Sequence, residues 1–433
     1  MQLDKCKLSD VAKVEISGVD KKTKDGETPV RLCNFTDVYY NWAVTSNMTE
    51  SFMEASANDN QIKKFSLKKG QVALTKDSET RYDIGIPTYI ADDFDNVILG
   101  YHCALVTPDE HKLSGKYLNA FMNSPYIHKY FENSASGSGQ RYALSIETLE
   151  NMPLLLPSLD EQKKIGDIFS ALDRKISLNR EINRNLEALA KQIYDYWFVQ
   201  FDFPNEEGKP YKSSGGKMAW NDILQMDIPE GWGICRLSEF ISKNNTGDWG
   251  ADEYSVNTPI EVGCIRGADI VKLNELPRRY IKESSKTKLL SEWDVVIEVS
   301  GGSPVQATGR SAFITPGVIR RNGGELTCSN FCHAFSFSDI RYSLYFFYVW
   351  RMFYDNGIMF NFEGKTSGIK NFMTETFIAN EWIKAPEAIA FKFFDLVKEL
   401  YTKIDTNIEE NNNLIKLRDE LLPLLMNGQV TIE

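Results

Sequence analysis

Apolar residues recur at three- and four-residue steps in two distant stretches of the chain. In "ISLNREINRNLEALAKQI", residues 176–193, the apolar face that contains Leu186 also contains Asn179, seven residues earlier. A second stretch, "IDTNIEENNNLIKLRDEL" at 404–421, holds Asn407 in a similar setting. Because this spacing puts side chains on one face of a helix, the pattern predicts two long helices, each with a polar residue in its apolar seam.

The sequence also marks where each helix begins. Ser158 precedes the first periodic residues and Glu161 follows three positions later, which predicts a capping box. Pro386 suits the first turn of the second helix. We expect helices at about 159–198 and about 387–426, each roughly 55–60 Å long.

Heptad positions predict that the two helices pack against each other. Antiparallel helices of equal length meet middle to middle, so Asn179 would face Asn407 and fix the register at some cost in stability. The alternative is two separate amphipathic helices, each packed on its own domain, with each asparagine at a solvated edge. The expected seam has Ile165, Leu172, Asn179, Leu186, Ile193, Phe393, Leu400, Asn407, Leu414 and Leu421 at a, and Ile168, Ile182, Leu189, Tyr196, Leu396, Leu417 and Leu424 at d.

Weak similarities at a nearly constant offset indicate an internal repeat. "KLSDV" and "RLSEF" lie 229 residues apart, as do "GQRYALSIET" at 139–148 and "GIKNFMTETF" at 368–377, so that Arg141 matches Lys370. The long helices match at an offset of 228. The chain therefore reads as two copies of one unit, each a globular domain followed by a long helix.

The globular parts show a mixed pattern. β-rich runs such as "GQVALT" (70–75) and "WDVVIEVS" (293–300) predict strands, and "SLYFFYVWRMFYDN" predicts a buried helix. The fold class that follows is α+β: two tandem mixed α/β domains separated by two long helices that form an antiparallel coiled coil, with pseudo-twofold repetition. The expected boundaries are 1–156 for the first domain, 157–200 for the first long helix, 201–229 for a linker, 230–385 for the second domain and 386–433 for the second long helix.

Composition narrows the class of protein. A chain of 433 residues with 42% hydrophobic residues can bury sizeable cores. Its net charge is −11 and no segment is strongly basic, so any nucleic-acid binding would rest on local patches or on a partner's charge. The seven cysteines follow no repeated spacing, which favours reduced thiols in a cytoplasm. Neither a signal peptide nor an apolar run of membrane-spanning length is present, so we expect a cytoplasmic protein with no membrane contact.

Motifs for catalysis or metal binding are weak throughout. Cys328, Cys332 and His333 form a CxxxCH, but no second ligand pair follows. "GKT" at 364–366 ends like a phosphate loop, yet Met359 occupies the position of the first glycine. No Asp/Asn-Pro-Pro-aromatic methyltransferase motif occurs. We therefore expect no active site, metal or cofactor on this chain.

The stretch "PSLDEQKKIGDIFSALDRKISLNREINRNLEALAKQIYDYWFVQFDFP" (157–204) resembles the central region of DNA-specificity subunits of Type I restriction-modification systems. "KGQVALTKDSETRYDIGIPTYI" (69–90) and "EWDVVIEVSGGSPVQATGRSAFI" (292–314) are similar to segments of that family's target-recognition domains. "SGSGQRYALS" (136–145) resembles the loop before its long helix, and "LRDELLPLLMNGQV" the end of its second helix. The resemblance covers essentially the whole chain in the right order.

The resemblance implies a subunit without catalytic activity. Each target-recognition domain would read one half of a bipartite sequence in double-stranded DNA. The helices would set the gap and dock two adenine-N6 methyltransferase (modification) subunits, which bring S-adenosylmethionine. Restriction subunits that translocate DNA would then join, and ATP and Mg are expected only on partner subunits.

Candidate DNA contacts follow from residue type, since base edges and phosphates are bound by Arg, Lys, Gln, Asn, Ser, Thr and loop amides. The matched pair Arg141 and Lys370 is the strongest candidate. The apolar outer face of the helices, including Phe169, Ala190, Trp197 and Phe198, suits either methyltransferase docking or packing on the chain's own domains. The predicted DNA-binding set is Lys76, Ser78, Thr80, Arg81, Ser138, Gln140 and Arg141 in the first domain, and Ser300, Gly301, Ser303, Gln306, Arg310, Lys365, Thr366, Ser367 and Lys370 in the second.

Three other hypotheses remain open. The chain could be the recognition subunit of another multi-subunit or phage-type DNA methylation system. It could be a coiled-coil adaptor without DNA contact, which a mobility-shift assay with methyltransferase present would distinguish. The third alternative is an enzyme with an unrecognised active site.

Overall fold

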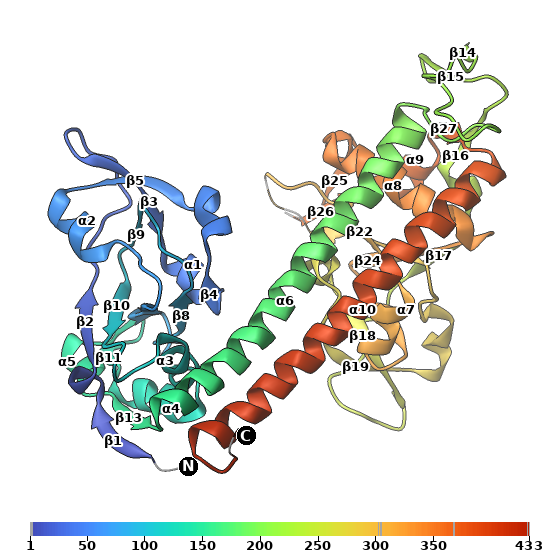
Figure 1. The fold of residues 1–433 in the computed structure, drawn as a ribbon. Helices are drawn as coiled ribbons and strands as arrows, with labels where there is room; N and C mark the ends of the chain where they lie inside the picture. The colour runs from blue at the N-terminus through green and yellow to red at the C-terminus, as the bar shows by residue number, and fades with distance from the viewer. Residues whose placement is uncertain (1–2, 302, 304, 367–368, 431, 433) are drawn as a thin grey trace. The chain divides into compact units, whose positions relative to one another are not determined.

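The computed structural model describes residues 3–301, 303, 305–366, 369–430 and 432, and these form two compact units. Unit 1 comprises residues 1–178 and 411–433, and unit 2 comprises residues 179–410. The helices α6 (Leu159–Tyr194) and α10 (Glu387–Met426) each contribute to both units (Figure 1). The domain boundaries expected from the sequence stay predictions, because this division cuts through both helices.

Unit 1 is built on a sheet of strand order β2–β10–β6–β8–β4, antiparallel except for the parallel pair β4–β8. A second sheet, β5–β3–β9, covers one face of it, and α3 and α6 pack on the other. The two-stranded sheet β1–β13 and the three-stranded sheet β11–β12–β7 complete the unit. The bounds are β1 Asp4–Lys7, β2 Ala12–Ile16, β3 Thr28–Cys33, α1 Phe35–Tyr39, β4 Ala43–Val44, β5 Met53–Ala57, α2 Asp59–Phe65, β6 Val72–Thr75, β7 Asp77–Ser78, β8 Pro87–Ile90, β9 Val97–Leu99, β10 Cys103–Pro108, α3 Gly115–Met122, α4 Pro125–Ser134, β11 Ser136–Ser138, β12 Arg141–Ala143, α5 Ile146–Glu150 and β13 Pro153–Leu156.

The central sheet of unit 1 is buried on both faces. Along β6, Val72 and Leu74 belong to the core beneath α3 and α6, whereas Ala73 belongs to the core shared with β3, as the two-residue period of a strand requires. Each Val or Leu buried in this way contributes roughly 1.5–3 kcal/mol. This explains why "GQVALT" is apolar along its length rather than alternating with polar residues.

Unit 2 repeats this topology except that, among the described residues, its main sheet has no counterpart of β4. The order β17–β24–β20–β22 matches β2–β10–β6–β8, β19–β18–β23 matches β5–β3–β9, and β16–β27 matches β1–β13. In both units the middle strand of the second sheet has one antiparallel and one parallel neighbour. The bounds are β14 Met218–Asn221, β15 Met226–Pro229, β16 Gly233–Arg236, β17 Ile241–Thr246, β18 Ile260–Ile265, β19 Arg278–Ile281, β20 Val295–Glu298, β21 Ser300–Gly301, β22 Ser311–Phe313, α7 Pro316–Arg321, β23 Leu326–Cys328, β24 Cys332–Phe337, α8 Ser343–Asp355, β25 Glu363–Thr366, β26 Ile369–Phe372, α9 Thr374–Ile378 and β27 Glu381–Lys384. The predicted repeat and the α+β fold class are confirmed.

Aromatic side chains fill the core of unit 2. The helix α8 is buried along most of its length, and its Trp350 and Tyr345 are almost completely covered. Trp197 and Phe198, which follow α6, lie in the same core, so they pack on the chain's own domain and are not available for docking a partner. Phe169 in unit 1 and Ala190 in unit 2 are buried in the same manner.

Both long helices form where the sequence predicts them. Ser158 and Glu161 make the expected capping box: the backbone N–H of Ser158 donates to a carboxylate oxygen of Glu161 at 3.0 Å, and the backbone N–H of Glu161 donates to the Ser158 hydroxyl at 3.4 Å. The Ser158 hydrogen bonds hold the pKa of Glu161 below its ordinary value. After Tyr194 the regular α-helix gives way to a π-helical turn, Asp195–Val199, so α6 ends slightly before the predicted position.

The seam between α6 and α10 is rotated from the predicted a/d positions to a and e. In unit 1, Ile165 at a and Phe169 at e share a core with the last turns of α10. In unit 2, Ala190 at e is buried with Phe393 at a. Since the start of one helix packs beside the end of the other in each unit, the pair is antiparallel, as predicted. The expected d residues Leu189, Tyr196, Leu396, Leu417 and Leu424 are exposed instead.

Buried asparagines are paired across the seam in unit 2, but in a different combination from the predicted one. The side-chain amide of Asn407 donates to the side-chain oxygen of Asn183 at 2.8 Å. Asn179, one turn earlier on α6, donates to Glu410 at 2.8 Å. The a/e seam explains the change, because it brings Asn183 at e onto the face that a/d packing would have left outside.

A buried ion pair attaches the globular part of unit 2 to α10. Asp405 accepts a hydrogen bond from the Arg321 guanidinium at 2.7 Å and another from the backbone N–H of Gly317 at 3.1 Å, and both charged side chains are buried. These donors belong to α7, which lies in a connection between β22 and β23 that is longer than its counterpart between β8 and β9. The contact is specific to the second repeat, because the position equivalent to Asp405 in α6 is Ser177.

Removing the Asn407 amide should weaken the seam. Asn407→Leu leaves the buried side-chain oxygen of Asn183 without its donor, and we expect a loss of about 1–3 kcal/mol in local stability. The double variant Asn183→Leu/Asn407→Leu should recover part of that loss. Hydrogen exchange of peptides from α6 and α10 measures these free energies. Asn412→Leu, at an exposed position of α10, is the control, and an equal loss in that variant would contradict the assignment.

Removing the acid that holds α7 should be more costly. Asp405→Ala leaves Arg321 buried and without its carboxylate, for which we expect a loss of about 3–5 kcal/mol. Glu409→Ala removes the neighbouring, exposed pair with Arg320 and should cost less than about 1 kcal/mol. Thermal unfolding compares the two variants, and similar losses would mean that the buried pair is not the attachment.

Candidate nucleic-acid interface

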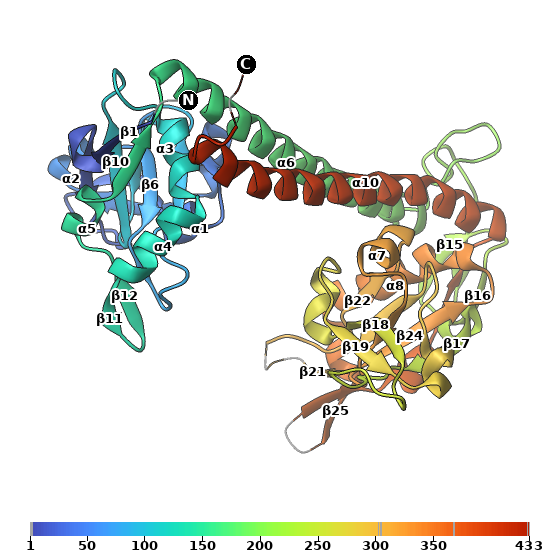
Figure 2. The same cartoon turned by 90° about the horizontal axis from the view of Figure 1, so that it is seen from below.

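A small sheet in unit 1 brings together predicted residues from two separate segments. The strand β12 pairs with β7 so that Tyr142 lies opposite Ser78, and the backbone N–H of Leu144 donates to the carbonyl of Lys76 at 2.8 Å. Figure 2 shows the β11–β12 hairpin projecting from the body of this unit. Gly137 in β11 has φ of 144°, and a Cβ there would meet the carbonyl oxygen of Arg141 at 2.1 Å, so the tight hairpin requires glycine.

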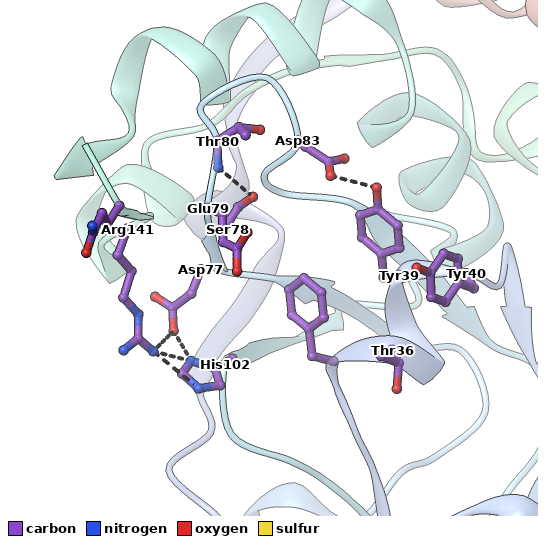
Figure 3. Close-up of a pocket in the computed structure, with 12 residues that line it drawn as sticks. Thr36, Tyr39, Tyr40, Asp77, Ser78, Glu79, Thr80, Asp83, His102 and Arg141 are labelled. Carbon is purple, nitrogen blue, oxygen red and sulfur yellow. Dashed lines mark hydrogen bonds and ion pairs between the residues drawn. The ribbon is translucent and has the colours of Figure 1, made fainter. Parts of the chain in front are cut away.

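The buried carboxylate of Asp77 is the centre of a charged cluster. Its Oδ2 atom lies 2.8 Å from Lys76 Nζ, within hydrogen-bonding contact of the His102 ring, and 3.6 Å from Arg141 Nη2. Arg141 Nη2 also lies 2.8 Å from Nδ1 of His102 (Figure 3). Burial raises the pKa of Asp77, but the hydrogen bonds from Lys76 and His102 outweigh it and hold the pKa below its ordinary value. Asp77 is therefore ionised at neutral pH.

Next to this cluster the surface is hollowed into a cavity of about 610 Å³. The far wall carries Tyr39, whose hydroxyl donates to Asp83 at 2.6 Å, and the exposed ring of Tyr40 (Figure 3). The hydrogen bond to Asp83 raises the pKa of Tyr39 to about 12, so the phenol stays protonated. The lining residues are Phe35, Thr36, Tyr39, Tyr40, Asp77, Ser78, Glu79, Thr80, Asp83, His102, Gln140 and Arg141.

Four predicted residues, Ser78, Thr80, Gln140 and Arg141, therefore line one cavity. Lys76 and Arg81 lie beside it, with Lys76 Nζ 5.7 Å from the centre of the Tyr101 ring and the Arg81 guanidinium 5.1 Å from that of Tyr142. These cation–π contacts hold both side chains next to aromatic faces. Ser138 contributes its backbone to β11.

Sequence reasoning did not select the opposite wall or His102. The tyrosine and acidic residues come from α1 and from the loop after β7, which only the folded sheet brings together. His102 has φ of 71°, a left-handed conformation that is uncommon for residues other than glycine. Such conformations gather at functional sites, but the sequence carries no mark of this one beyond the turn "GYHC".

Unit 2 has a corresponding sheet, β21–β26–β25, in which Gly301 lies opposite Lys370. Lys370 Nζ lies 2.9 Å from the buried carboxylate of Glu363 and 5.0 Å from the centre of the Phe360 ring. The other Glu363 oxygen accepts from the backbone N–H of Thr308 at 2.8 Å. The desolvated carboxylate would have a raised pKa, but these hydrogen bonds hold the pKa of Glu363 below its ordinary value.

Most of the remaining predicted residues of unit 2 hold the same loop and sheet together. Arg310 makes two hydrogen bonds to the buried Glu298, at 2.7 and 2.8 Å. Gly301, with φ of 143°, leaves room for that carboxylate, because a Cβ there would lie 2.6 Å from it. Ser303 and Gln306 close a turn in the same loop. Ser300 bonds Asn371, Lys365 and Thr366 form the backbone of β25, and Ser367 lies outside the described residues.

The described residues were also compared with the requirements of a metal site, a reactive thiol and a membrane-spanning helix. No group of three or more His, Cys, Asp or Glu side chains there could hold a metal ion. Burial raises the pKa of the Cys103 thiol to about 12, and that of Cys332 to about 12, so both thiols are protonated. Every helix within the described residues is too short or too polar to cross a membrane.

Comparisons with known proteins agree with one another. A family model described as "Type I restriction modification DNA specificity domain" matches residues 4–188. The Type I restriction enzyme MjaIX specificity subunit of Methanocaldococcus jannaschii is 26% identical over 421 residues, which cover 94% of this chain and 86% of that protein. The Type I restriction enzyme HindI specificity subunit of Haemophilus influenzae is 32% identical over 143 residues, covering 33% and 30%.

A solved structure supports the same assignment at the level of the fold. The crystal structure of the Type I restriction-modification S subunit from M. genitalium matches with a TM-score of 0.55 at 14% identity, covering 98% of this chain and 96% of that one. The second repeat, which lies outside the family-model match, has the strand order of the first apart from the edge strand β4. Residues 4–188 therefore carry the Type I restriction modification DNA specificity domain, and the chain as a whole is similar to DNA-specificity subunits of Type I restriction-modification systems.

Proposed function

We propose that this chain is the non-catalytic DNA-reading subunit of a Type I restriction-modification complex. The globular domains at 1–156 and 230–385 would each read one half of a bipartite double-stranded DNA site, and the helices at 157–200 and 386–433 would set the gap between them. One observation carries the proposal: each repeat presents a hairpin sheet with a cation at the matched position, Arg141 or Lys370. A duplicated surface suits a ligand that has two similar half-sites.

The first hairpin sheet and its cavity have the chemistry of a DNA groove contact. Arg141 is 61% exposed, so its guanidinium can reach a phosphate or the O6 and N7 atoms of guanine. Thr80 and Gln140 add donors and acceptors on the same wall. Glu79 and Asp83 can accept from the amino groups of cytosine or adenine, and this would account for carboxylates near a polyanion.

In the second domain we propose a narrower set of direct contacts. This set consists of Lys370, whose side chain is 18% exposed and makes one ion pair with Glu363, and the turn residues Ser303 and Gln306. Arg310 is committed to Glu298, so we assign it to support of the sheet rather than to base contact. Ser138, Ser300, Lys365, Thr366 and Ser367 stay proposed contacts on the strength of the sequence.

The exposed d positions of the helices suit the docking of two copies of one partner. Leu189 and Leu417 are 42% and 43% exposed, and Tyr196 and Leu424 are 38% and 36% exposed. Each pair is separated by the repeat offset of 228 residues. Two equivalent apolar surfaces on a repeated scaffold would suit two copies of one subunit. We propose that these partners are methyltransferase subunits carrying S-adenosylmethionine. Their surfaces would also supply positive charge for DNA binding by this acidic chain. Restriction subunits would join that assembly.

Removing the matched cation should weaken DNA binding. Arg141→Ala should lower the affinity of the methyltransferase complex for its target duplex and reduce the slope of log K against log salt by about one ion, since one phosphate or base contact is lost. Mobility shifts over a salt series measure both quantities. Lys129→Ala, an exposed lysine on α4 paired with Glu132, is the control. Unchanged affinity and slope for Arg141→Ala would contradict the proposed contact.

Charging one helix face should remove one partner. Leu189→Asp and Leu417→Asp should each reduce the number of bound methyltransferase subunits from two to one, because each places a carboxylate in an apolar contact. Native mass spectrometry measures the stoichiometry. Leu178 is similarly exposed, but its repeat equivalent is Thr406, so Leu178→Asp should leave two subunits bound. Loss of both subunits in either single variant would contradict two independent sites.

A further inference from the structure

Buried carboxylates lie directly under the cations of both hairpin sheets. Asp77 in unit 1 and Glu363 in unit 2 are each 9% exposed. A carboxylate at a DNA-facing surface opposes binding, because it repels phosphates. Neither is exposed enough to accept hydrogen bonds readily from a base edge. Their presence calls for a role other than direct contact.

In unit 1 the carboxylate gathers side chains from three segments. Asp77 Oδ2 contacts Lys76 from the position before β7, His102 from the turn before β10, and Arg141 from β12. Arg141 is the most exposed of the three and the most distant from the carboxylate, at 3.6 Å. It can therefore bind a second acceptor while Asp77 keeps its other two partners.

In unit 2 the same arrangement is built from a different strand. The matched cation Lys370 pairs with Glu363 of β25, whereas Asp77 belongs to β7. At the repeat offset of 229, Glu363 corresponds to Ser134, which is not acidic. The cation occupies the equivalent position in both copies, but the buried acid comes from unrelated positions. Both domains therefore pair the matched cation with a buried carboxylate, but the two carboxylates come from different strands.

We propose that Asp77 and Glu363 are positioning residues that hold Arg141 and Lys370 in the orientation for reading DNA, without touching DNA themselves. This inference rests on the proposed function. A long cationic side chain loses rotamer freedom when it binds, and a buried carboxylate restricts that freedom beforehand. Its hydrogen bonds keep Asp77 ionised at neutral pH, so it remains a negatively charged partner for Arg141.

The direction in which DNA affinity changes when the carboxylate is removed distinguishes a positioning role from a purely electrostatic one. Removing a negative charge near DNA should strengthen binding to every sequence if the carboxylate acts only through its field. If it positions Arg141, removing it should weaken binding to the target sequence and leave binding to other sequences unchanged or stronger. The ratio of target to non-target affinity is therefore the decisive quantity.

The test uses the full chain assembled with its methyltransferase subunits, on the duplex identified by methylome sequencing. Asp77→Asn should weaken target binding by about tenfold, with no loss on a scrambled duplex, and Asp77→Glu should restore part of it. Glu50→Gln removes an acid paired with Arg31 outside the cavity and should leave the ratio unchanged. Equal tightening on both duplexes by Asp77→Asn would overturn the proposal.

Glu363→Gln provides an independent test in the second domain if Asp77→Asn fails to fold. With duplexes altered in one half-site at a time, Glu363→Gln should lose discrimination only at the half-site read by the second domain. A purely structural defect would lower discrimination at both half-sites and overturn the positioning role. If Arg141→Ala weakens binding but Asp77→Asn does not, positioning fails and the proposed function stands. If the assembled complex shows no sequence preference, the proposed function itself fails.

Discussion

Buried amides between α6 and α10 impose the constraint on which the rest of the fold depends. An asparagine within an apolar seam must find a partner, because an unpaired buried amide is costly. Asn407 meets Asn183 and Asn179 meets Glu410, and a shift of the helices by one turn would separate both pairs. Leucine would tolerate several registers, so the polar residues exchange some stability for a single alignment.

The rotated seam divides the helix surface between two tasks. Positions a and e join the helices to each other and to the domain cores. The d leucines are left outside, repeated at equal spacing on the two helices. The same rotation that buries Asn183 therefore leaves two equivalent apolar surfaces exposed. The alignment of the helices and the proposed docking of partners both follow from the a/e seam.

Much of this architecture follows from local sequence signals. The helices, the capping box at Ser158 and the core role of the α8 aromatics depend on residues that are close in sequence, and the repeat is visible as similar short segments 228 or 229 residues apart. The seam position could not be fixed in this way, because Leu189 satisfies a heptad whether it is buried or exposed. Tyr39, Asp83 and His102 were missed since their proximity to Arg141 arises from pairing between distant strands. The buried acids were missed for the same reason.

The contact between α7 and α10 limits how freely the second domain can be exchanged. Its attachment acid, Asp405, belongs to the helix, whereas the donors Arg321 and Gly317 belong to the globular domain. A transplanted domain lacking that arginine would leave a buried carboxylate uncompensated in its new host. In the first domain the corresponding attachment is neutral, because the buried Gln162 of α6 bonds the backbone of Ser114 and Lys112. Exchange of specificity between relatives is thus chemically unequal for the two ends of the chain.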